Sequence, residues 1–297
     1  MSDLDPSPQQ PPPPDPGYNR TTLITSLTTY YSLLSKTVSI HPSHIHPAPP
    51  TGHAPSSLPL FHLQCLGFND RMLDLILHLP IISSTTRPVY PGTTPIAYTN
   101  SLFDDYSEED FDVNDVHAVG LWPLPDERIP EGVVPISRPL QGDPGGVWWM
   151  IDTNNGWVGI LGEITPHTAS ITRPVAEVPE DEQWRTARPV PATAYFDGLA
   201  RDLIELELLP VPFNPGLLVW EIWHSKGHKE FQVFADEAKA IYQQCGWPDL
   251  EKFKRARCKR LLEELQKRVR AWEKVRWAAM PEPPAYTDAQ GNPVEPH

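Results

Sequence analysis

Cysteine is scarce in this chain of 297 residues, and the three that occur stand far apart. Cys65, Cys245 and Cys258 form no CxxC pair and no even set that could build a disulfide framework. We therefore expect them to be reduced, mostly buried small residues. This usage favours the cytoplasm or the nucleus as the location of the protein.

Long apolar runs are also lacking. The most apolar stretches, residues 75–82 and 217–223, are shorter than the about 20 residues that a membrane-spanning helix needs. The first 17 residues have neither the basic start nor the apolar centre of a secretory signal. The sequence thus predicts no membrane span.

The motifs of common enzyme classes are missing as well. GxSxG, GxxxxGK[ST], and GxGxxG followed by an acidic residue do not occur, so the matching hydrolase, P-loop and Rossmann mechanisms lack support. His224 and His228 stand four residues apart, but no Glu directly follows His224 and Gly227 lies between the two. We therefore predict no metal site, no cofactor and no catalytic residue.

Positive charge is limited and uneven. The chain has 24 Lys and Arg against 38 Asp and Glu, a net charge of −14, which argues against specific nucleic-acid binding. Residues 251–276 are the exception, with eleven Lys or Arg against four Glu. Residues 104–115 hold seven carboxylates, which is typical of a solvated loop. The basic segment could therefore meet an acidic partner or this loop.

The most informative stretch that is present is GGVWWMIDTNNGWVGIL, residues 145–161. Two runs of β-branched and aromatic residues flank a turn rich in Asp, Asn and Gly, which is typical of a β-hairpin. Trp149 falls on one face of the first run, and Trp148 and Met150 fall on the other. Because both faces are apolar, we expect both to be covered, with the hairpin inside the sheet.

Apolar residues at helical spacing, with capping residues and prolines at the ends, predict five helices. They cover about 19–36, 69–79, 191–208, 228–245 and 249–279. Asn19 or Thr21 can cap the first helix and Asn69 the second. Residues 41–59 hold so many prolines that we expect an extended segment there, whereas short runs between 88 and 161 predict antiparallel strands.

Helices on both sides of a run of strands predict an α+β fold. We expect a twisted, mainly antiparallel sheet flanked by helices in one domain over residues 19–280, with 249–279 as a long basic C-terminal helix. The Pro-rich tails, 1–18 and 281–297, are expected to be disordered because they have little to bury.

The early helix TTLITSLTTYYSLL, the segment DRMLDLILHLPII and the run GVVPISRPLQGDPGGVWWMIDTNNGWVGIL together give the chain a likeness to known proteins. In this order of parts it resembles an uncharacterised protein family of filamentous fungi. More distantly it resembles the SUKH superfamily, which includes the fungal cell-wall-assembly regulator, over residues 66–161. The resemblance implies an α+β domain that binds other proteins and inherits no catalytic residues.

These observations favour a non-enzymatic intracellular interaction or regulatory module whose partner is another protein. The candidate interaction residues come from the hairpin and the basic helix: Trp148, Trp157, Lys259, Lys267, Arg268 and Arg270.

The alternative is a hydrolase-like enzyme that acts on a small or carbohydrate ligand through Asp152 and nearby carboxylates beside the tryptophans. A third interpretation treats the C-terminal helix as a binder of anionic surfaces. A deep pocket with two convergent carboxylates favours the enzyme, whereas a broad exposed apolar patch favours the binding module.

Overall fold

A computed structural model describes most of the chain between Gly17 and Ala279. The described residues are 17–83, 87–104, 106, 111, 120–123, 128–140, 146–162, 190–214, 219–226, 229 and 231–279. Nearly all of both predicted tails and most of the acidic segment 104–115 lie outside them. The described part combines helices with antiparallel sheets, so the predicted α+β class is confirmed.

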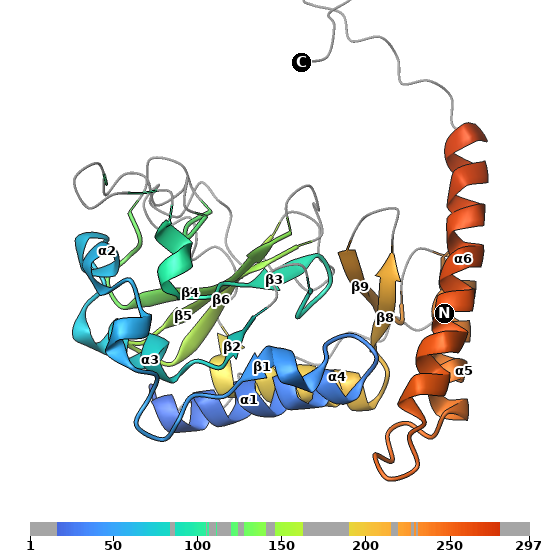
Figure 1. Cartoon of the computed structure of the whole chain (residues 1–297), viewed down its shortest axis with the longest axis horizontal. Coiled ribbons are helices and arrows are strands. Elements are labelled where there is room, and N and C mark those ends of the chain that lie inside the picture. The colour runs from blue at the N-terminus through green and yellow to red at the C-terminus, as the bar shows by residue number, and fades with distance from the viewer. Residues whose placement is uncertain are drawn as a thin grey trace, which may run out of the picture.

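An antiparallel sheet of five strands lies at the centre of the described structure, in the order β3-β4-β5-β6-β7 (Figure 1). Its strands are β3 (Thr93–Pro95), β4 (Val133–Pro139), β5 (Trp148–Asp152), β6 (Trp157–Leu161) and β7 (Val190–Pro191). The tryptophan hairpin supplies β5 and β6, which both have neighbours on either side. The prediction that the hairpin is an interior pair of the sheet is therefore confirmed.

The two faces of β5 are covered to different degrees. Trp149 and Met150 point to opposite faces and are both 0% exposed, whereas Trp148 at the start of the strand is only partly buried. The turn closes at Gly156, whose φ of +79° lies in the left-handed region that glycine adopts without strain. The apolar alternation of the sequence thus matches the burial of the strand.

Two helices, α1 (Arg20–Lys36) and α4 (Ala192–Ile204), lie side by side along the sheet (Figure 1). The side chain of Asn19 accepts a hydrogen bond from the Thr22 amide, so Asn19 is the N-cap of α1. Tyr30 of α1 and Phe196 of α4 both contact Trp149, with ring centroids 6.3 and 5.4 Å from the indole. The helix pair therefore covers the Trp149 face of the sheet and closes the first hydrophobic core.

The proline-rich stretch after α1 is not wholly extended. It holds a short strand, β1 (Ile45–His46), which pairs with β2 (Ile81–Ile82), and two 3₁₀ turns, η1 (Pro42–His44) and η2 (Pro55–Ser57). Three further short elements are α2 (Leu60–Cys65), α3 (Asp70–His78) and η3 (Asn100–Phe103). Asn69 caps α3 as predicted, since its side chain accepts from the Met72 amide. Helix α2 was not predicted, because its six residues are too few to show helical periodicity.

A second hydrophobic core lies between a two-stranded hairpin and two C-terminal helices. These elements are β8 (Leu208–Asn214), β9 (Val219–His224), α5 (Gln232–Gln244) and α6 (Arg255–Ala279). The prolines after residue 208 were expected to end the preceding helix, and the strand that contains Pro210 and Pro212 was not predicted. Proline is compatible with this strand because, in a two-stranded hairpin, each strand has an edge without a partner.

Three helix boundaries predicted from the sequence are wrong. The helix expected over 228–245 begins only at Gln232, where the chain leaves a turn at Phe231. The helix expected over 191–208 ends at Ile204, which is 41% exposed, because Leu206 adopts a φ of +59° and turns the chain into β8. The last helix begins at Arg255 instead of Asp249. The Asp249 carboxylate accepts from the amides of Glu251 and Lys252 and so closes a separate turn before α6.

The end of α1 connects the two cores. Leu33 packs against both, and Val38, just after α1, is buried in the second core. The guanidinium group of Arg255 donates to the carbonyl oxygens of Thr37 and Ile40, at 2.6 and 3.3 Å. The first turn of α6 is thereby fixed to the residues that follow α1.

Glu207→Gln is expected to lower the free energy of unfolding by about 1 kcal/mol at neutral pH. This is less than the loss of a fully buried charged hydrogen bond would cost, because the Glu207 side chain is partly exposed and solvent screens its charge. The Glu207 carboxylate accepts from the Ser225 hydroxyl at 2.6 Å and from Lys239 Nζ at 3.2 Å, which lowers its pKa. Stability gained from a lowered carboxyl pKa is present above the unfolded-state pKa and is lost as the pH falls through the folded-state pKa.

Urea unfolding of the parent protein and of the Glu207→Gln variant should therefore converge in strong acid. Glu205→Gln, at an exposed position two residues away, is the matched control and should change stability little at any pH. A difference between the Glu207→Gln variant and the parent that stays constant from neutral pH to strong acid would contradict this prediction.

Candidate functional site

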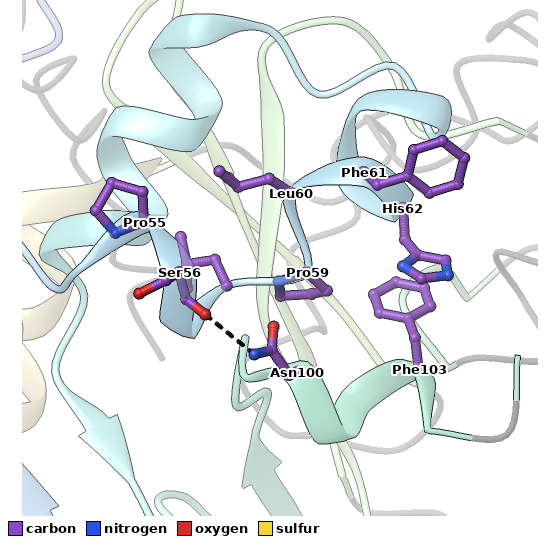
Figure 2. A pocket seen from close by; sticks show the side chains of 9 residues that line it. Pro55, Ser56, Pro59, Leu60, Phe61, His62, Asn100 and Phe103 are labelled. Atoms are coloured by element: carbon purple, nitrogen blue, oxygen red, sulfur yellow. Dashed lines mark hydrogen bonds between the residues drawn. The ribbon is translucent and has the colours of Figure 1, made fainter. Parts of the chain in front are cut away.

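An open pocket of about 460 Å³ lies between η2, α2 and η3 (Figure 2), and we call it the aromatic pocket. Its volume is in the range typical of ligand-binding clefts. The residues that line it are Pro55, Ser56, Leu58, Pro59, Leu60, Phe61, His62, Asn100 and Phe103. Residues 55–59 of the pocket belong to the stretch that was expected to be an extended segment, residues 60–62 belong to α2, and Asn100 and Phe103 belong to η3.

Local backbone restraints hold the walls of the pocket in place. Pro55 occupies the first turn of η2 and Pro59 directly precedes α2, where the fixed φ of proline restricts the chain. The Asn100 side-chain amide donates to the carbonyl oxygen of Ser56 at 3.1 Å and joins η3 to η2, as Figure 2 shows. The two sides of the pocket are therefore connected directly, without an intervening loop.

Stacked rings form one wall of the pocket. The His62 imidazole lies on the Phe103 ring with a centroid distance of 4.6 Å and an interplanar angle of 10° (Figure 2). The ring centroids of Phe61 and Phe111 lie 5.4 and 4.9 Å from that of the same imidazole, and both rings are nearly perpendicular to it. The Nε2 atom of His62 is buried and has no hydrogen-bond partner in the part of the chain that the structure describes. His62 therefore acts here mainly as a flat aromatic surface.

The chemistry of the lining suits binding better than catalysis. No carboxylate occurs among the described lining residues, so the paired acids that would favour a hydrolase are not found in the aromatic pocket. Phe61 is 43% exposed and is one of the few large apolar side chains so exposed in the described part of the chain. An exposed aromatic ring beside fixed prolines offers apolar contact area at little cost in conformational entropy.

Asp152, the carboxylate named for the enzyme alternative, is used inside its own turn. One carboxylate oxygen accepts from the Asn154 amide at 2.9 Å, and the other accepts from the Asn155 side chain at 2.8 Å. The residue is 7% exposed. These contacts are those of a turn-forming aspartate.

The two candidate tryptophans of the hairpin do not meet. Trp148 is paired with Leu161 at one end of the hairpin and Trp157 with Asp152 at the other. Both are partly buried, and the register places them on the same face of the sheet. The structure therefore provides no joint platform made by these two rings.

The four candidate basic residues are also not gathered on one face of α6. Helical geometry places Arg268 on the side opposite to Lys259 and Arg270. Arg268 forms a two-pronged ion pair with Glu237 of α5, and Lys259 lies 3.8 Å from Glu263. Lys267 is exposed. Two of the four candidate cations are thus already paired with carboxylates of the chain itself.

The described residues contain no group of three or more His, Cys, Asp or Glu side chains that could hold a metal ion. His224 is described, but His228 lies outside the described residues, so the predicted absence of a site between them is not decided. Among the described helices, none combines the length and the apolar character that crossing a membrane requires.

No residue of the aromatic pocket was among the candidate site residues predicted from the sequence. The available signal was composition, because Pro, Phe and His are concentrated in residues 55–62. That signal gives no indication that η3 forms the opposite wall.

Comparisons of the chain with protein-family models, curated proteins and solved structures found no match.

Proposed function

We propose that the protein is a non-enzymatic interaction module that binds an extended, proline-rich segment of a partner protein in the aromatic pocket. The observation that carries the proposal is an open pocket of about 460 Å³ with apolar and aromatic walls, in which Phe61 is 43% exposed. A protein-binding α+β module is also what the resemblance to the SUKH superfamily implies.

The shape and chemistry of the pocket support a peptide of this class. Proline-rich segments adopt the polyproline II conformation in advance, so they lose little entropy when they lie against aromatic side chains. Phe61, which is 43% exposed and whose ring centroid lies 5.4 Å from that of His62, offers such a surface. A proline-rich ligand has free carbonyl oxygens, and the side chains of Ser56 and Asn100 at the pocket carry hydrogen-bond donors.

The proposal includes a location in the cytoplasm or the nucleus. All three cysteines are free, and Cys245 and Cys258 are buried. Such thiols are typical of proteins from reducing compartments. The hydrolase alternative receives no comparable support, since the Asp152 carboxylate is engaged in its turn and the described lining of the pocket lacks carboxylates.

Phe61→Ala is expected to weaken the binding of a synthetic oligoproline peptide about tenfold, because it removes an aromatic contact at the pocket. Heteronuclear NMR titration measures the affinity and shows whether the amide signals of the non-proline residues in 55–62 shift. A flexible Gly-Ser peptide of equal length should not bind. Because Phe61 is 43% exposed, the variant should remain folded.

Leu250→Ala is the matched control, since Leu250 is 50% exposed and lies in the turn before α6. Its affinity for the oligoproline peptide should equal that of the parent. The proposal fails if oligoproline does not bind, or if it binds the Phe61→Ala variant as tightly as the parent.

A further inference from the structure

The chain itself carries a segment of the class that the aromatic pocket is proposed to bind. Residues 6–14 have the sequence PSPQQPPPP, with six prolines among nine residues, and we call them the proline tail. They lie outside the described residues, and only Asp15 and Pro16 separate them from Gly17, where the described structure begins. The proline tail is thus tethered to the domain at a known point.

The tether point lies next to α3. A Cβ atom on Gly156 would lie 3.0 Å from the Tyr18 Cα atom, so the chain passes close to the hairpin turn just before α1. Arg71, in the first turn of α3, donates to a carbonyl oxygen of the same hairpin turn at 3.3 Å. Arg20, in the first turn of α1, forms an ion pair with Asp74 of α3. The start of α1 is therefore fixed against α3.

The aromatic pocket also adjoins α3. Helix α2, whose first residues line the pocket, is joined to α3 by residues 66–69, and the Phe68 amide donates back to α2 at 3.0 Å. The His53 amide donates to the Leu77 carbonyl oxygen of α3 at 2.8 Å, two residues before Pro55 of the pocket. Figure 1 shows the start of α1, α2 and α3 at the same end of the described structure. The tether point and the pocket are therefore both held by contacts to one short helix.

The proline tail is long enough to enter the pocket. In the polyproline II conformation a chain rises about 3.1 Å per residue, so residues 6–14 would span about 9 to 34 Å from Gly17. The other proline-rich segment, residues 281–297, follows α6, which stands on the opposite side of the described structure from α2 (Figure 1). Length and point of attachment thus favour the proline tail as the occupant of the pocket.

We propose that the proline tail occupies the aromatic pocket of its own molecule and must be displaced by a partner, an inference that rests on the proposed function. Its proline rings would lie against Phe61, which is 43% exposed. The pocket would thus give the tail the apolar contact that its own composition lacks. Because the tether is short, the tail would act at an effective concentration on the order of millimolar. Only a tighter or multivalent proline-rich partner would then displace it.

The test compares the full parent chain with a tail variant of the same length. The tail variant carries Pro11→Ser, Pro12→Ser, Pro13→Ser and Pro14→Ser, which remove the run that favours polyproline II. Heteronuclear NMR titration should show that synthetic oligoproline binds the tail variant about fivefold more tightly than the parent, because the competitor is gone. Before peptide is added, the Asn100 side-chain amide signal should differ between the two proteins. Oligoproline should return this signal of the tail variant toward its position in the parent.

Phe61→Ala in both proteins gives a second, independent measurement. In the parent, this substitution weakens the binding of the added peptide and also that of the competing tail, so the two effects partly cancel. In the tail variant it weakens the added peptide alone. The loss of affinity should therefore be larger in the tail variant than the about tenfold loss expected in the parent.

A control variant with Pro281→Ser, Pro283→Ser and Pro284→Ser alters the other proline-rich segment and should bind oligoproline as the parent does. Equal affinity of the parent and the tail variant would overturn this inference and leave the proposed function intact. A tail variant that does not bind oligoproline would overturn both. A difference at Asn100 that disappears on dilution would place the tail in the pocket of a second copy and would also overturn the inference.

Discussion

Trp149→Ala is expected to lower the free energy of unfolding by about 3 to 5 kcal/mol. The indole is 0% exposed and lies in the first core between the sheet and the α1–α4 pair. Its ring contacts Tyr30 and Phe196, and its Nε1 donates to the Tyr195 hydroxyl at 2.9 Å. Truncation to alanine would leave a large cavity and remove the hydrogen bond to Tyr195.

Denaturant unfolding measures this loss, and Trp157→Ala is the matched control. Trp157 belongs to the same hairpin but is only partly buried, so its truncation should cost about 1 to 2 kcal/mol. A cost below about 1 kcal/mol for Trp149→Ala would be incompatible with a buried tryptophan at the centre of the core.

Gly146→Ala should destabilise the protein by about 3 kcal/mol, the upper end of the usual cost of overpacking. A Cβ atom at this position would lie 2.2 Å from the Gly92 carbonyl oxygen and 2.6 Å from the Cα atom of Pro139. Both are backbone atoms: Gly92 directly precedes β3, and Pro139 belongs to β4 and is paired with Thr93. Neither can therefore move without shifting β3 against β4. A single methyl group is therefore expected to disturb the edge of the sheet.

Gly198→Ala is the control of opposite sign. Gly198 lies inside α4, and a Cβ atom there would have only the Arg201 side chain within 4 Å, at 3.7 Å. Alanine at this position should stabilise the helix by about 1 kcal/mol. Thermal unfolding of the two variants should move the midpoint in opposite directions, and a stabilising Gly146→Ala would refute the close backbone approach.

Sequence patterns predicted the elements whose structure depends on near neighbours. The cap Asn69 was predicted, and Asn19 was one of two predicted candidates beside Thr21, because an N-cap bonds an amide only three residues away. The hairpin around Trp149 was predicted because alternation and turn residues lie in one short stretch. In these places local preference and the final packing agree.

Elements that depend on tertiary context were not predicted. Strand β8 carries two prolines and persists because it pairs with β9 and covers the second core. The start of α6 depends on the turn made by the Asp249 carboxylate, which competes with the use of the same residue as a helix cap. Local sequence cannot decide between these two uses of one side chain.

The candidate sites also divide into features that local sequence predicts and features that depend on tertiary contacts. The aromatic pocket requires η2 and η3 to meet, and the bond that joins them connects Ser56 with Asn100, 44 residues apart. The basic residues of α6 were recognised from composition, but their pairing with α5, as in the Arg268–Glu237 bond, depends on helix packing. Composition therefore indicated charge, whereas the structure shows which cations are already neutralised.

The bonds from Arg255 to the residues after α1 have a consequence for the order in which the chain can fold during synthesis. Arg255 follows Thr37 by 218 residues, so at about 5 to 20 residues per second the ribosome needs on the order of ten to forty seconds to make the intervening chain. Throughout this time Val38 lacks the helices that bury it, and the carbonyl groups of Thr37 and Ile40 lack their donor. The residues that follow α1 therefore reach their final contacts only after α6 has been made. The second core can be completed only when translation of α6 is nearly finished.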